Sequence, residues 1–133
     1  MIARYCSLVL MCFLACAFSA TSFASELPSV KTKTGSSVFY KAPVTRAEAT
    51  KLRDYLIEEE FFDETPKEVL LSKEGKTYQF NFVVKKGIET DPEFIAEAKV
   101  FSKSMSKDVF NNAAVDIHAL DDKLNLLKVI VAF

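Results

Sequence analysis

His118 is the one histidine of the sequence and the side chain best suited to acid–base chemistry near neutral pH. Asp116 stands two residues earlier, on the same face of an extended strand, where its charge could shift the pKa of the imidazole. No serine or cysteine stands at a spacing that would make a nucleophile with His118. Because a histidine without such partners usually lies on the surface, we expect no catalytic role for it.

Acidic residues gather between positions 54 and 68, where Lys67 is the only opposing charge. They are Asp54, Glu58, Glu59, Glu60, Asp63, Glu64 and Glu68. The three consecutive glutamates fall at the C-terminal end of a predicted helix, where negative charge opposes the helix dipole. Such a placement could serve a cation or a basic partner, but the spacing of a calcium-binding DxDxDG loop is absent. A solvated acidic end is the simpler interpretation, and we expect neither a metal nor a cofactor.

Lys99, Lys103 and Lys107 follow one another at steps of four residues and form a basic stripe along one face of a predicted helix. The default interpretation is a solvated helix face. The alternatives are a contact with an acidic partner, with anionic lipid headgroups, or with the acidic helix end of another copy. Any such contact would be weak and sensitive to salt.

Four aromatic residues, Phe39, Tyr40, Phe61 and Phe62, could line a groove beside a sheet and hold a small ligand. A carboxylate-dependent hydrolase that uses groups near Asp63 or Asp116 is a remote alternative. The sequence contains no G-x-S-x-G, P-loop, H-E-x-x-H or dinucleotide-binding motif. We therefore expect that the protein is not an enzyme.

Residues 1–24 have the pattern of a secretory leader. Arg4 is their only charge, an apolar run covers residues 5–18, and small residues lead to a cleavage site after Ala24. The apolar run is too short for a transmembrane helix, and no later segment is apolar enough to span a bilayer. We predict a periplasmic or secreted protein.

All three cysteines, Cys6, Cys12 and Cys16, lie in this leader. The residues before Cys16 loosely resemble a lipobox, so a lipoprotein anchored at Cys16 is the alternative. Cleavage after Ala24 would leave no thiol, which excludes thiol catalysis, disulfide scaffolds and Cys-ligated metals. The formal net charge would change from −1 to −2 with the loss of Arg4, so we expect no nucleic-acid partner.

The elements that position these residues follow from local patterns. Residues 25–43 read as a polar linker in which 37–41 could form a short edge strand. A capping box at Thr45 and Glu48 begins a helix that should end near residues 59–60. Alternating apolar residues then predict a hairpin of strands over 69–72 and 77–84.

The pattern repeats in the second half. Asp91 and Pro92 begin a second amphipathic helix, and strands are predicted over 115–120 and 124–133. An offset of 48 residues superposes the two halves, which could reflect an internal duplication. We predict one α+β domain over residues 44–133, with the order αββαββ: a four-stranded antiparallel sheet with both helices packed on one face.

The run VTRAEATKLRDYLIEEEFFDETPKEVLLSKEGKTYQFNFVVKK resembles a module of uncharacterised bacterial envelope and membrane proteins. The resemblance covers about residues 40–133, and its marks are the VTxxEAxxL helix start, the FFD at the helix end and the later FNxxV. It implies a location in the cell envelope and assigns no activity.

Together these features favour a small exported protein that binds a protein partner, associates with itself or has a structural role. A small-ligand-binding or inhibitor-like domain is the alternative. The candidate interaction surface comprises Lys99, Lys103, Lys107, Glu58, Glu59, Glu60, Phe61 and Phe62.

Overall fold

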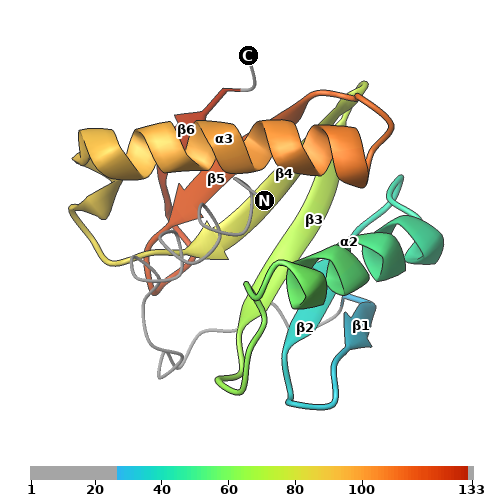
Figure 1. The fold of residues 1–133 in the computed structure, drawn as a ribbon. Coiled ribbons are helices and arrows are strands. Elements are labelled where there is room, and N and C mark those ends of the chain that lie inside the picture. The colour runs from blue at the N-terminus through green and yellow to red at the C-terminus, as the bar shows by residue number, and fades with distance from the viewer. Residues whose placement is uncertain (1–26, 132–133) are drawn as a thin grey trace.

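The computed structural model describes residues 27–131, in which two helices pack on one face of a six-stranded sheet and a short 3₁₀ helix precedes the second of them (Figure 1). The predicted leader, its cleavage site after Ala24 and the alternative anchor at Cys16 lie outside the described residues. The α+β class and the position of both helices on the same face are confirmed.

Helix α2 (Arg46–Glu58) begins at the predicted capping box. The Glu48 amide donates to the Thr45 hydroxyl at 3.2 Å, and the Thr45 amide donates to the Glu48 carboxylate at 2.9 Å. These two bonds satisfy amides that have no partner within the helix. The chain leaves the helix at Glu60, which adopts a left-handed conformation with φ 63°.

Helix α3 (Pro92–Asp108) also begins as predicted, with Asp91 at the N-cap and proline in the first turn. The Asp91 carboxylate accepts from the Glu93 amide at 2.9 Å. Asn111 and Asn112 adopt positive φ values after the helix and redirect the chain toward the next strand. The short 3₁₀ helix η2 (Ile88–Thr90) precedes α3.

The sheet differs from the predicted four-stranded antiparallel one. Its strands are β1 (Ser29–Lys31), β2 (Ser37–Tyr40), β3 (Glu68–Glu74), β4 (Thr77–Val83), β5 (Val115–Leu120) and β6 (Leu126–Ile130), in this spatial order. The pairs β2–β3 and β4–β5 are parallel, and the other three pairs are antiparallel. The reason is that each helix returns the chain across the sheet, so the strand after it runs parallel to the strand before it.

Two strands of the sheet, β1 and β2, lie within the segment that the sequence suggested as a polar linker. The predicted short strand is present as β2, but β1 occupies the edge and β2 lies between β1 and β3. Val38 is fully buried and pairs with Val69 of β3. The order of the domain is therefore ββαββαββ.

The two hairpins that follow the helices have the same register up to Ala119, after which an irregularity in β5–β6 shifts the pairing of Leu120 to Leu126. Val69 pairs with Phe82 in β3–β4, and Ile117 pairs with Ile130 in β5–β6. Residues 48 positions apart therefore occupy matching places in the two hairpins.

The main core lies between the helices and the sheet, and the ring of Phe61 is at its centre. This side chain is fully buried and stacks on Phe101 of α3 with ring centroids 5.6 Å apart. It also meets Phe80 and Phe82 edge-on, at 5.8 and 6.1 Å. A smaller apolar cluster on the opposite face of the sheet is built on Phe39 and Leu120.

Candidate functional site

A groove of about 760 Å³ lies between the β1–β2 turn, the last turns of α2 and the loop that follows α2. Its lining residues are Lys31, Thr32, Lys33, Thr34, Arg53, Asp54, Ile57, Glu60, Phe62, Asp63 and Glu64. Three segments that are separate in the sequence therefore meet at one edge of the sheet, beside β1.

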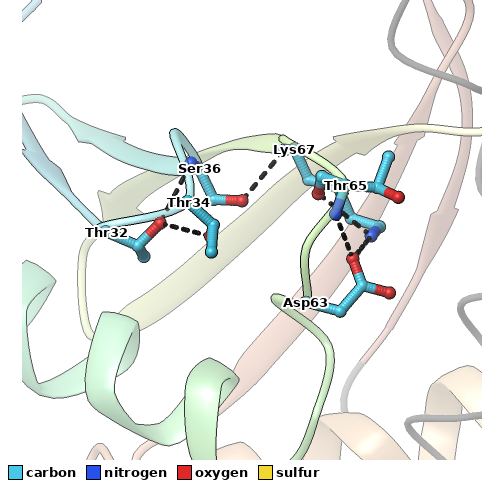
Figure 2. Close-up of polar contacts among 6 residues, drawn as sticks. All are labelled: Thr32, Thr34, Ser36, Asp63, Thr65 and Lys67. Atoms are coloured by element: carbon cyan, nitrogen blue, oxygen red, sulfur yellow. Dashed lines mark hydrogen bonds and ion pairs between the residues drawn. The ribbon is translucent and has the colours of Figure 1, made fainter.

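The β1–β2 turn forms one wall of the groove and is held by its own hydroxyl groups (Figure 2). The Thr32 and Thr34 hydroxyls are 3.0 Å apart, and the Ser36 amide donates to the Thr32 hydroxyl at 3.0 Å. Gly35 adopts φ 94°, a conformation that a side chain would strain. The Ser36 hydroxyl accepts from the Lys67 amide at 3.0 Å and so connects this wall to the opposite loop.

The opposite wall is the loop between α2 and β3, and Asp63 fixes its shape. The Asp63 carboxylate accepts from the Thr65 amide at 2.9 Å and from the Lys67 ammonium at 2.7 Å (Figure 2). Burial raises the pKa of Asp63, but these hydrogen bonds and the Lys67 charge outweigh burial and hold the pKa below its usual value. Asp63 is thus an ionised structural anchor, unsuited to the general-acid role that needs a raised pKa.

The groove has two apolar lining residues, Ile57 and Phe62. Ile57 is 45% exposed, which is high for a large aliphatic side chain, whereas Phe62 is only 5% exposed. The Phe62 amide donates to the Leu56 carbonyl at 3.0 Å, which ties this loop to the end of the helix. The groove therefore offers an apolar surface held on a fixed backbone.

Charges of both signs surround this apolar surface. Arg53 pairs with Asp54 at 3.0 Å and also donates to the Lys31 carbonyl of edge strand β1 at 3.3 Å. Lys33 of the turn and Glu60 of the loop, which both line the groove, are exposed. The rim can therefore pair with both anionic and cationic groups.

The structure brings only one of the four predicted groove aromatics to this groove. Phe62 lines it, but Phe61 is buried at the centre of the core. Phe39 and Tyr40 are neighbours on one strand and so face opposite sides of the sheet, Phe39 in the smaller cluster and Tyr40 in the main core. Phe61, Phe39 and Tyr40 therefore complete apolar cores, and Phe62 alone of the four lines the groove.

The three glutamates at the C-terminal end of α2 differ in their exposure to solvent. Glu58 and Glu60 are exposed, whereas the Glu59 Oε2 atom is buried and has no hydrogen-bond partner among the described residues. Within residues 27–131 no three His, Cys, Asp or Glu side chains are grouped so that they could hold a metal ion. The acidic segment alone therefore does not define a metal site.

This arrangement leads to a prediction for calcium and magnesium. We expect isothermal titration of either cation into the protein at about 100 mM salt to give no binding heat, because exposed carboxylates at this ionic strength are screened. Saturable heat that disappears in the Glu58→Gln/Glu60→Gln variant would contradict this prediction.

The basic stripe lies on α3 as predicted, and Lys99, Lys103 and Lys107 are all exposed. None of the three lines the groove of the same chain. Val100 lies next to them and is 40% exposed.

His118 and Asp116 lie on the sheet face opposite the helices. Burial lowers the pKa of His118, and the charges of Asp116 and Glu74 offset this effect only in part. The neighbouring Asn81 side chain donates to the Leu70 carbonyl at 3.0 Å and to the Ser72 hydroxyl at 3.1 Å. These bonds make the Asn81 side chain part of the sheet structure.

A second polar cluster, which the sequence patterns did not reveal, joins α2 to the β3–β4 hairpin. The Tyr78 hydroxyl donates to the Glu48 carboxylate, and the Lys73 ammonium lies 4.6 Å from the centre of the Tyr78 ring. The Phe110 ring stacks on the Tyr78 ring, with the two centroids 4.0 Å apart. Burial and the Glu48 carboxylate raise the pKa of Tyr78 to about 12.

The carboxylate in this cluster is stabilised in its charged form. Burial pushes the pKa of Glu48 upward, but the hydrogen bonds from Tyr78 and Thr45 and the charge of Lys73 outweigh it and lower the pKa. The cluster thus connects α2 to the β3–β4 hairpin, and the capping box is the only part of it that the sequence indicated.

No helix among residues 27–131 is long and apolar enough to cross a membrane.

Comparisons with known proteins identify the family of this domain. Neither the curated proteins nor the solved structures contain a match to this chain. One family model, AF_1994_N, described as a family N-terminal domain, matches residues 29–131, from the first residue of β1 to the residue after β6. The chain therefore belongs to the AF_1994_N N-terminal domain family.

Proposed function

We propose that this protein is a small exported protein of the cell envelope and a non-catalytic module that binds a polypeptide partner in the groove beside α2. The observation that carries the proposal is the composition of the groove, in which the exposed Ile57 and the underlying Phe62 are surrounded by charged residues. An apolar centre with a polar rim is the usual anatomy of a protein interface.

The loops around the groove support a binding role because their shape is set before any partner arrives. Asp63, Thr32 and Ser36 hold the two walls through hydrogen bonds within the chain (Figure 2). A preformed surface loses little conformational entropy on binding, which favours affinity.

The proposed location rests on the leader pattern of residues 1–24 and on the resemblance of residues 40–133 to envelope modules. The description of the family as an N-terminal domain supports a modular role.

A small ligand is the second candidate occupant. The groove volume of about 760 Å³ lies within the range of about 300–1,000 Å³ that is typical of small-molecule pockets. Native mass spectrometry of the purified protein tests this candidate, because a bound small molecule would appear as a discrete mass increase.

Affinity capture with matched variants tests the polypeptide partner. The full chain, the Ile57→Asp variant and the Leu126→Asp variant are each used to capture proteins from an envelope extract of the producing cells. Ile57 and Leu126 are 45% and 53% exposed, so both substitutions change a surface position, but only Ile57 lines the groove. We expect one protein to be retained by the full chain and by Leu126→Asp, and to be reduced by about tenfold or more with Ile57→Asp.

Circular dichroism of both variants verifies that they are folded. Equal retention of the partner by Ile57→Asp and by the full chain would show that the groove is not the binding site. Capture of no specific protein at either low or high salt would contradict the proposed partner.

A further inference from the structure

Four large hydrophobic side chains are exposed within residues 27–131, namely Ile57, Val100, Leu126 and Val131. Two of them lie on the helices, Ile57 near the end of α2 and Val100 in the middle of α3. Both helices cover the same face of the sheet (Figure 1). The helical layer therefore presents two exposed apolar positions to solvent.

The C-terminal end of α2 beside Ile57 is acidic. Glu58 and Glu60 are exposed within three positions of Ile57, the last turn of α2 contains no basic residue, and Arg53 is paired with Asp54. The partial negative charge at a helix C-terminus adds to these carboxylates. We call Ile57, Glu58 and Glu60 the acidic patch.

Lysines are the main exposed charges around Val100, and the acidic Glu97, three residues before it, is half-buried. Lys99, Lys103 and Lys107 are exposed. Lys103 and Lys107 follow Val100 by three and seven residues and so share its side of the helix, and Lys99 lies one turn before Lys103. The buried side chains of α3, among them Phe94 and Phe101, occupy the other side. We call Val100 and these three lysines the basic patch.

We propose that the partner of the groove region is a second copy of this chain, with the basic patch of each copy seated on the acidic patch of the other. Opposite charges surround one exposed apolar residue on each patch, so the two surfaces are complementary in both charge and polarity. Because both patches belong to the same helical layer, a two-fold axis can form both contacts at once and close the assembly as a dimer.

This inference rests on the proposed function, because it names the partner of the surface that contains Ile57. The charges beside the two patches are also opposite in sign. The exposed Lys33 lines the groove beside the acidic patch, and the exposed Glu93 lies in the first turn of α3, the helix that carries the basic patch. Because the ionic contacts are exposed, we expect association that is strong only at low ionic strength.

Sedimentation velocity of the full chain tests the dimer. We expect dimer at about 20 mM salt and a dissociation constant at least about tenfold weaker at about 500 mM salt. The variant Lys99→Glu/Lys107→Glu and the variant Glu58→Lys/Glu60→Lys should each be monomeric at low salt. A control with the same charge change at exposed turn positions, Lys76→Glu/Lys123→Glu, should dimerise like the unmodified chain.

Mixing the two monomeric variants gives the decisive result. One variant then carries only acidic patches and the other only basic patches, so the mixture should form a one-to-one heterodimer at low salt. A mixture that remains monomeric, or an unmodified chain that is monomeric at low salt, would overturn the proposed dimer. A different protein captured through Ile57 would then still support the groove as a binding site, so the two proposals fail separately.

Discussion

Replacement of Phe61 with alanine is expected to lower the free energy of unfolding by about 3–5 kcal/mol. Phe61 is fully buried and contacts four other aromatic rings, with centroid distances from 5.6 to 6.1 Å. One ring lies in the loop after α2, two lie on β4 and one lies on α3. The cavity left by alanine would therefore open at the centre of the domain. The surrounding side chains cannot fill it without disturbing several elements together.

Equilibrium unfolding in urea, followed by circular dichroism, measures this loss. Phe61→Leu retains most of the volume and should lose less than Phe61→Ala. Ile57→Ala is the matched surface control, since Ile57 is 45% exposed on the neighbouring helix, and its effect should stay within about 0.5 kcal/mol. Equal losses for Phe61→Ala and Ile57→Ala would show that Phe61 is not a core residue.

Replacement of Tyr78 with phenylalanine is expected to lower the free energy of unfolding by about 2 kcal/mol at neutral pH. The Tyr78 hydroxyl donates to a charged carboxylate, Glu48, and the Tyr78 side chain is only 7% exposed. Hydrogen bonds to charged groups contribute more to stability than neutral ones. The capping-box bonds of Glu48 with Thr45 would remain.

The same hydrogen bond makes the stability depend on pH in the alkaline range. Folding raises the pKa of Tyr78 from 10.0 to about 12, so the folded state holds the phenolic proton more tightly than the unfolded state. The stabilisation is therefore complete below about pH 10 and is lost as the pH rises through about 12.

Urea unfolding of the unmodified chain and of Tyr78→Phe between pH 7 and pH 12 measures both effects. We expect the difference between the two proteins to be constant up to about pH 10 and to shrink above it. Tyr40→Phe is the matched control, because it removes a hydroxyl from another tyrosine that is buried in the main core. Parallel pH curves for the unmodified chain and Tyr78→Phe would contradict the assigned role of Tyr78.

The sequence determined the elements whose signals are local. The capping box at Thr45 and the pair Asp91–Pro92 place both helix starts, because a cap involves residues within one turn of each other. Alternating burial of Tyr78, Phe80 and Phe82 was likewise predicted, because a strand exposes its two faces with a period of two residues.

Only the tertiary structure decided how these elements are assembled. Strands β1 and β2 have three and four residues, too few for a periodic pattern, and pairing with β3 makes β2 part of the sheet. The direction of the helical crossovers then made the sheet mixed.

The roles of Phe61 and Phe62 were also decided at this level. These adjacent residues have the same side chain, but one completes the aromatic core and the other lines the groove. The groove itself brings residues 31–34 against residues 53–64. A contact between segments so far apart in the sequence depends on the assembly of the sheet and the helices, whereas a helix cap depends only on its neighbours along the chain.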